Sequence, residues 1–401
     1  MKIIYHHRTQ ATGAEGVHIA SIIKGFRDMG HEVEVVSPSA VDPLMSAGSS
    51  PYEKKEGLKS TVFRFLSRSL PQFLFEIVEL SYNAVAYFKL SKALMKQKVA
   101  FIYERYAFFS FMGAYLAAKN CIPLIIEVNE IAGEQRVRKQ VFVGWARKIE
   151  GYIFKKADLI MVVSQFLKDK IIGLGVNGEK IIVLPNAVDP QRFSLSVSSN
   201  GLRERYSIAD GVLVFGFIGW FVAWHNLELL VDAFAAVAEK SNNVRLVLVG
   251  DGVLKEELQK QARIKGVEEK VIFTGSVSHK DIPQYIGLMD ICVIPATNEY
   301  RSPIKMFEYM AMAKAVVAPK LKPIEDVLED GHDAMFFEPD DFSTLTEVFK
   351  KLIQDAQMRS LLGRRARQKI EKEYTWENNA RKILKLAEGL AGDKDKVEQV
   401  C

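Results

Sequence analysis

The side chains best suited to chemistry lie in one short segment, SPIKMFEYMAM, at residues 302–312. Ser302 and Pro303 are residue types that cap and begin helices, so we expect a helix over 302–313. The free N–H groups and the positive dipole end of such a helix attract anions, and Lys305 adds a full charge. Glu308 follows three residues later on the same face. These groups suit a diphosphate beside a ribose diol; the alternative is an ordinary helix with a solvated Lys and Glu.

The elements around this segment predict a parallel sheet. An apolar run at 291–295 precedes it and another at 315–318 follows it, which is the strand–loop–helix–strand order of a βαβ unit. The same alternation fills the chain on both sides of a turn at 185–190 and a serine-rich stretch at 194–201. Strands are expected at 2–5, 32–36, 61–65, 100–103, 124–128, 159–163 and 180–184, and then at 212–218, 244–249, 271–273, 291–294, 315–317 and 334–337.

This alternation predicts an α/β fold of two Rossmann-like, doubly wound domains that face a central cleft. We place the first domain at 1–190 and the second at 203–374. One more helix runs to about residue 391, and a charged tail follows at 392–401. In such a fold the ligand binds at the carboxyl ends of the strands.

Three glycine-containing loops are expected to face that ligand. Gly219 follows the strand at 212–218, and His225 near the next helix start can donate a hydrogen bond in either tautomer. Gly250 follows the strand at 244–249. Gly13 and Gly16 lie in the loop QATGAEG, between the first strand and the first helix. Each of these loops is also compatible with a plain turn.

One sequence motif is set aside. Residues 173–178 (GLGVNG) match G-x-G-x-x-G, but they follow a helix and precede a strand, so we interpret them as a helix end and loop. No P-loop is present. Carboxylates do not cluster as they would around an octahedral metal, so we expect a metal-independent site and no cofactor.

Net charge and the lengths of the apolar runs limit the class of protein. Net charge is +5, and residues 1–200 carry 26 Lys and Arg against 18 Asp and Glu. This excess is modest and lacks a recognition motif, so nucleic acid is not an expected partner. No leader and no run of about 18 apolar residues is visible, which predicts a cytoplasmic location.

The stretch 59–98 adds an anionic membrane surface as a candidate partner, at the inner face of the membrane. It interleaves basic and apolar side chains, as proteins at charged lipid surfaces do. A domain core with a solvated rim is the alternative. The residues concerned are Lys59, Phe63, Arg64, Phe65, Leu66, Arg68, Leu70, Phe73, Leu74 and Phe75.

Taken together, the motifs resemble those of glycosyltransferase family 4, which has the GT-B fold. Each motif is weak, but they follow the family order from about residue 8 to 376. The helix after Trp376 is similar to the family's crossover back to the first domain. The motifs are QATGAEG with GHEV at 30–33, Ala157-Asp158 before Val163-Ser164, PNAVD at 185–189, FIG at 217–219, VGDG at 249–252, FTG at 273–275 and the 302–312 segment.

The resemblance implies transfer of a sugar from a nucleotide-sugar to an acceptor hydroxyl, with retention at the anomeric carbon and without a metal. The second domain would hold the donor: Glu308 the ribose, Lys305 and its helix start the diphosphate, and the backbone near Val277 the base. The acceptor would be a glycan or a lipid-linked molecule of the cell envelope. The implied donor residues are Gly219, His225, Gly250, Val277, Ser278, Ser302, Lys305 and Glu308, and those on the acceptor side are Gly13, Gly16, Glu127 and Asn129.

Several positions depart from the family pattern. Phe221 or its neighbours stand where an arginine is frequent, and His225-Asn226 where a lysine and glycine are. Tyr300 takes the place of a first glutamate, with Glu299 one residue away, and Asn129 aligns with a strand-end histidine. We therefore count Lys305, Glu308, Asn129 and His225 as catalytic candidates. A nucleotide-sugar epimerase and a catalytically weak, nucleotide-sugar-binding paralogue remain alternatives.

Overall fold

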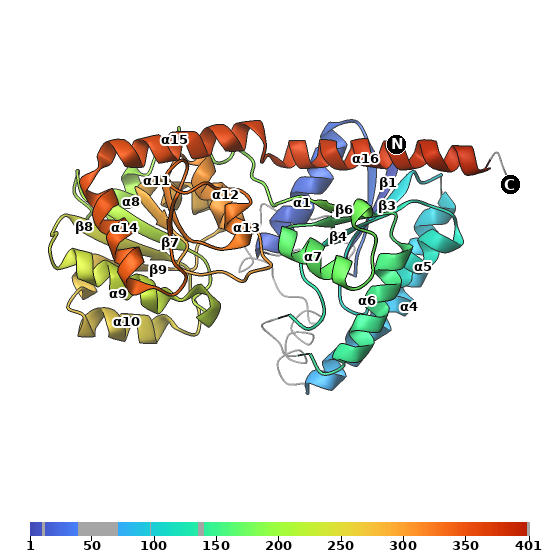
Figure 1. Ribbon diagram of the computed structural model, residues 1–401, viewed down its shortest axis with the longest axis horizontal. Coiled ribbons are helices and arrows are strands. Elements are labelled where there is room, and N and C mark those ends of the chain that lie inside the picture. Colours follow the sequence, from blue (N-terminus) through green and yellow to red (C-terminus); the bar gives the residue numbers. More distant parts are fainter. Residues whose placement is uncertain (10–12, 39–70, 97, 135–139, 399–401) are drawn as a thin grey trace. The chain divides into compact units, whose positions relative to one another are not determined.

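The computed structural model describes residues 1–9, 13–38, 71–96, 98–134 and 140–398. The chain divides into two compact units, one of Met1–Leu184 with Trp376–Cys401 and one of Pro185–Thr375. Each contains a six-stranded parallel sheet flanked by helices (Figure 1). Parallel strands are buried on both faces, which explains why they appear in the sequence as continuous apolar runs.

The first unit has the strand order β2-β1-β3-β4-β5-β6. All of its strands are parallel. Ile4 of β1 pairs with Glu34 of β2 and with Ile102 of β3. The C-terminal helix α16 packs on α1 and so belongs to this unit. Its elements are β1 (Lys2–His6), α1 (Gly13–Asp28), β2 (Glu32–Val36), α4 (Gln72–Lys96), β3 (Phe101–Arg105), α5 (Met112–Lys119), β4 (Leu124–Val128), α6 (Val143–Lys156), β5 (Leu159–Val162), α7 (Gln165–Gly173), β6 (Ile181–Val183) and α16 (Trp376–Glu398).

The second unit has the strand order β12-β11-β10-β7-β8-β9. Chain order reverses between β7 and β10, so the carboxyl ends of these two strands form the switch point at which open α/β sheets bind ligands. Its elements are α8 (Asn200–Arg205), β7 (Leu213–Ile218), η2 (Ala223–His225), α9 (Leu227–Ala238), β8 (Val244–Val249), α10 (Lys255–Ile264), β9 (Val271–Gly275), η4 (His279–Asp281), α11 (Ile282–Leu288), β10 (Ile291–Val293), α12 (Ile304–Ala311), β11 (Ala315–Pro319), α13 (Lys322–Glu325), β12 (Met335–Phe337), α14 (Phe342–Gln354) and α15 (Ala356–Lys372).

The second unit's core has one layer on each side of its sheet. Phe215 and Phe217 face α9 and α14, while Val214 and Ile218 face α11 and α12. This alternation along β7 follows from the two-residue period of a strand. A rigid β7 therefore fixes the position of the loop that begins at Gly219.

The structure corrects two expectations about the elements and agrees with a third. α1 begins at Gly13, so Gly13 and Gly16 lie in its first turns rather than in a loop. α16 continues to Glu398, beyond the expected end near residue 391. The segment 173–178 is indeed the end of α7 and a loop, with Gly175 at φ +82°. The strand expected at 61–65 lies outside the described residues.

No helix in the described ranges is both long enough and apolar enough to cross a bilayer.

Candidate functional site

The start of α12 lies above the switch point of the second sheet. Pro303 is the N-cap and makes no side-chain cap, and the helix begins at Ile304. The expectation that Ser302 caps the helix is therefore wrong. Its hydroxyl accepts from the backbone N of Asn186 at 3.2 Å, and its carbonyl accepts from Asn186 Nδ2 at 2.5 Å. Ser302 thus anchors the loop, while the first N–H groups of α12 have no side-chain cap.

Lys305 is the most unusual side chain here. Its Nζ is buried and has no hydrogen-bond partner among the described residues. It lies 4.0 Å from the centroid of the Phe217 ring, a cation–π contact. Burial lowers the pKa of Lys305 to about 7, Glu308 acts in the opposite direction, and Arg301 lowers it further. A buried amine without a partner is costly, so this position is better explained by a ligand than by stability.

Glycines make room around this amine. A Cβ on Gly219 would lie 2.6 Å from Lys305 Nζ, and Gly219 has φ +152°, where L side chains are strained. A Cβ on Gly250 would overlap the carbonyl oxygen of Gly219. The backbone N of Gly250 donates to Gly275 O at 3.1 Å. The loops after β7, β8 and β9 therefore pack closely on one another, and Gly219 lies beside Lys305.

His225 is held neutral beside Lys305. Burial is the main cause that lowers the pKa of His225, and the charge of Lys305 lowers it further, to about 3. Its Nδ1 lies 3.4 Å from the carbonyl oxygen of Ala296, which can only accept, so Nδ1 carries the proton. Nε2 is therefore left as an acceptor. This geometry suits a sugar hydroxyl better than a phosphate, which changes the role expected for His225.

A hydrogen-bonded relay holds Glu308, which is 5% exposed. Arg192 Nη2 donates to His279 Nδ1 at 2.5 Å and to His279 O at 2.5 Å. Because arginine only donates, His279 Nδ1 accepts, and its Nε2–H donates to Glu308 Oε1 at 3.2 Å. Sequence reasoning missed both Arg192 and His279. The only available signal was that His279 directly follows Val277 and Ser278, the segment implied for the base.

This relay gives a first prediction. His279→Leu should weaken nucleotide binding by about fivefold, because one hydrogen bond that orients Glu308 is lost. His279→Asn keeps an N–H donor and should retain most of the affinity. Isothermal titration of both variants with nucleoside diphosphates measures the difference. Equal affinity for the leucine variant and the unsubstituted protein would show that the relay does not position Glu308.

Arg301 supplies a second cation that sequence reasoning did not assign. Its guanidinium lies 5.5 Å from the centroid of Tyr300 and 5.9 Å from that of Trp224. Its charge lowers the pKa of both Lys305 and His225. Arg301 therefore adds positive potential beside Lys305 and His225.

In the first unit, Glu127 lies at the centre of a buried polar cluster at the carboxyl ends of β3 and β4. It accepts from His18 Nε2 and from Tyr103 OH, both at 2.9 Å, and from Arg105. Asn129 Nδ2 donates to it at 2.7 Å. Burial alone would raise the pKa of Glu127, but His18 and Arg105 together hold it far below its ordinary value. The structure thus unites the predicted Glu127 and Asn129 and adds His18 and Arg105, which no sequence signal singled out.

In the described part of the chain, no three His, Cys, Asp or Glu side chains converge as they would around a metal ion.

Two six-stranded Rossmann-like units, with a diphosphate-compatible helix start at the switch point of the second, define the GT-B class. The family models agree: the one described as Glycosyltransferase Family 4 matches residues 15–192, and Glycosyl transferases group 1 matches residues 212–355. The chain belongs to the family 4 type of glycosyltransferases.

Solved structures share this fold along nearly the whole chain. Anabaena HepE in complex with UDP has a TM-score of 0.70 at 19% identity, covering 97% of this chain and 100% of that one. Sucrose-phosphate synthase from Thermosynechococcus elongatus has a TM-score of 0.73 at 14% identity, covering 98% and 99%. At sequence identities this low, the similarity shows a shared fold and nothing more.

Curated relatives match over shorter stretches. The Alpha-D-kanosaminyltransferase of Streptomyces kanamyceticus is 27% identical over 165 residues, which is 41% of this chain and 42% of that protein. A GDP-mannose-dependent phosphatidylinositol monomannoside mannosyltransferase of Mycolicibacterium smegmatis is 23% identical over 62% of this chain and 68% of its own. The chain thus spans less than two thirds of the length of several of the relatives it matches.

Proposed function

We propose that this protein transfers a sugar from a nucleotide-sugar to an acceptor hydroxyl, with retention at the anomeric carbon. The observation that carries the proposal is the buried, partnerless amine of Lys305, with Glu308 on the same helix. A diphosphate would supply the missing partner, and a ribose diol would suit the carboxylate. The structures of HepE in complex with UDP and with UDP-glucose support a nucleotide-sugar as the donor.

The proposed reaction uses this placement. The bond between the anomeric carbon and the phosphate oxygen breaks, and a new bond forms from that carbon to the acceptor oxygen. The hydroxyl proton passes to the leaving diphosphate, so no protein base is needed. Negative charge grows on the diphosphate as its bond breaks. Preorganised positive groups lower the barrier there, and Lys305, the N–H groups of α12 and Arg301 are the candidates.

The acceptor proposed is a glycan or a lipid-linked molecule of the cell envelope. The mycobacterial relative, named as a mannosyltransferase of a phosphatidylinositol mannoside, supports such an acceptor. The base of the donor stays open, because HepE is described with UDP and this relative as GDP-mannose-dependent. His225 Nε2 would accept a hydrogen bond from a hydroxyl of the donor sugar.

The test is a panel of nucleotide-sugars screened by thermal shift, since a ligand of the folded state stabilises it by mass action. Any donor found is then incubated with candidate acceptors, and the anomeric configuration of the product is read by NMR. Transfer with retention supports the proposal. Inversion of the sugar's own stereocentre without transfer would favour the epimerase alternative, and binding without turnover would favour the paralogue.

We expect transfer to be independent of divalent metal, with Lys305 and the α12 N–H groups neutralising the diphosphate instead. Activity in EDTA should match activity in buffer within about twofold, because no metal ion stabilises the leaving diphosphate in the proposed reaction. The assay compares initial rates with and without the chelator. Loss of activity in EDTA that Mn²⁺ or Mg²⁺ restores would contradict the expectation.

A further inference from the structure

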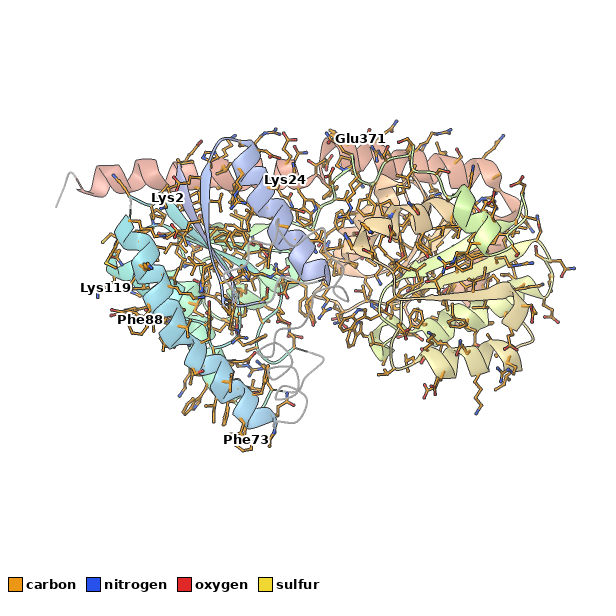
Figure 2. All side chains as sticks on the ribbon, turned by 180° about the vertical axis from the view of Figure 1, so that it is seen from behind. Lys2, Lys24, Phe73, Phe88, Lys119 and Glu371 are labelled. Atoms are coloured by element: carbon orange, nitrogen blue, oxygen red, sulfur yellow. The ribbon has the colours of Figure 1, made fainter. Side chains whose placement is uncertain are left out.

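Helices α4, α5 and α6 form one layer of the first unit and lie side by side, with α5 packed against both neighbours (Figure 1). α4 is 25 residues long, but few of its side chains reach the core. Its outer face carries Phe73, Ile77, Val85, Phe88 and Met95, which recur at intervals of three, four or seven to eight residues and so share one side. Phe88 is 71% exposed and Met95 is 80% exposed. Figure 2 shows Phe73 and Phe88 on the outer side of this helix.

α6 extends this apolar face. Both carboxylate oxygens of Glu76 in α4 accept backbone N–H groups just before α6, from Val141 at 2.6 Å and from Phe142 at 2.8 Å. The first turns of the two helices are therefore joined. Trp145, the third residue of α6, is 64% exposed and has its ring 6.1 Å from that of Phe142. The start of α6 thus adds exposed aromatic side chains next to the second turn of α4.

The exposed charge on this layer has a single sign. All residues of the three helices are described, and their acidic side chains are Glu76, Glu79 and Glu150. Glu76 and Glu150 are buried, and Glu79 is paired with Arg8 at 2.6 Å. The exposed charged side chains are all basic: Lys92, Lys96, Lys119, Arg147, Lys148, Lys155 and Lys156. Of these, Lys96 is paired with Glu34 of β2 at 2.7 Å.

We propose that this α4–α6 surface docks on an anionic lipid surface. Exposed aromatic and aliphatic side chains can insert among headgroups while the surrounding lysines meet acidic lipids. A second copy of the chain is a poorer occupant, because a two-fold contact would bring two uniformly basic surfaces together. The proposal goes beyond the transfer reaction and does not depend on it. The membrane expectation covered 59–98; its residues 59–70 lie outside the described residues, whereas Phe73 and the rest of α4 belong to the surface proposed here.

The test is co-sedimentation of the full chain with vesicles of phosphatidylcholine, with and without phosphatidylglycerol, at low and high salt. We expect binding only to the anionic vesicles, and weaker binding at high salt. The triple variant Lys148→Ser, Lys155→Ser, Lys156→Ser should lower the partition coefficient on the order of a hundredfold. Phe88→Ser with Trp145→Ser should also abolish sedimentation.

Matched controls come from the second unit. Lys240 and Lys260 are exposed lysines there, and Ile264 is 72% exposed. The variants Lys240→Ser, Lys260→Ser and Ile264→Ser should bind vesicles as the unsubstituted protein does. Circular dichroism and thermal unfolding of every variant show that it is folded. Absence of binding at low salt, equal binding to neutral vesicles, or equal loss in the controls would overturn the proposal. So would dimerisation without lipid that Phe88→Ser with Trp145→Ser abolishes.

Discussion

Lys305→Met should lower the rate of sugar transfer by about 10²–10³-fold, the effect typical of losing one preorganised group that stabilises transition-state charge. The same substitution should make the free protein more stable. Its amine is buried without a hydrogen-bond partner among the described residues, and the neighbouring Phe217 ring would accept a methionine side chain readily. We expect a gain of about 1–3 kcal/mol in the free energy of unfolding near neutral pH.

The pH dependence of this gain has a definite sign. The pKa of Lys305 is about 7 in the folded protein and 10.5 as its ordinary value. Between these two values the unfolded chain holds more protons than the folded one, so the stability of the unsubstituted protein rises with pH. The destabilisation that comes from burying the charged Lys305 amine is complete below about pH 7 and disappears toward pH 10.5. The advantage of the methionine variant should shrink over that window.

Urea unfolding at several pH values, together with initial transfer rates, measures both effects. Lys314→Met is the matched control. Lys314 is also a lysine of low pKa through burial, but its Nζ donates to Gly287 O at 3.0 Å. Removing it should therefore destabilise the protein, since a buried carbonyl loses its partner. If Lys305→Met destabilises the protein and leaves transfer intact, Lys305 is structural.

Glu308→Gln should weaken nucleotide binding by about tenfold to over a hundredfold, because charge-assisted hydrogen bonds contribute about 1.5–3 kcal/mol. Glutamine has nearly the same shape and can still accept from His279, so the substitution removes mainly the charge. Isothermal titration with UDP and GDP measures the affinity.

Glu325→Gln is the control for this prediction, since Glu325 is an exposed carboxylate on α13 of the same unit. It should leave affinity unchanged. Normal affinity of both variants would mean that the nucleotide lies elsewhere.

The sheets were predictable because each strand is a short apolar run between turn residues. Runs such as 244–249 and 291–294 correspond to β8 and β10 with boundaries within one residue. Helix starts were less predictable. Ser302 has the ideal residue type for a cap, but its hydroxyl is used by Asn186, 116 residues away in sequence. Local propensity cannot anticipate such a competing partner.

The site was predictable only as far as it is local in sequence. Lys305 and Glu308 share one helix face, so their spacing alone indicates a shared ligand. The electrostatic state of Lys305 depends on Phe217 in another strand, and that of Glu308 on His279. Contacts between distant segments set both states, and no periodicity in the chain encodes them.

The placement of α16 has a consequence for synthesis on the ribosome. Trp376 lies 4.7 Å from His18, ring to ring, and Ala380 packs against Gly25 of α1. The first unit therefore remains incomplete until the last helix has emerged. Translation of the roughly 200 intervening residues takes about 10–40 s. During that time the second unit can finish folding, while the α1 side chains that α16 later covers stay exposed to solvent. A chaperone that protects nascent chains should therefore engage the early half of this protein.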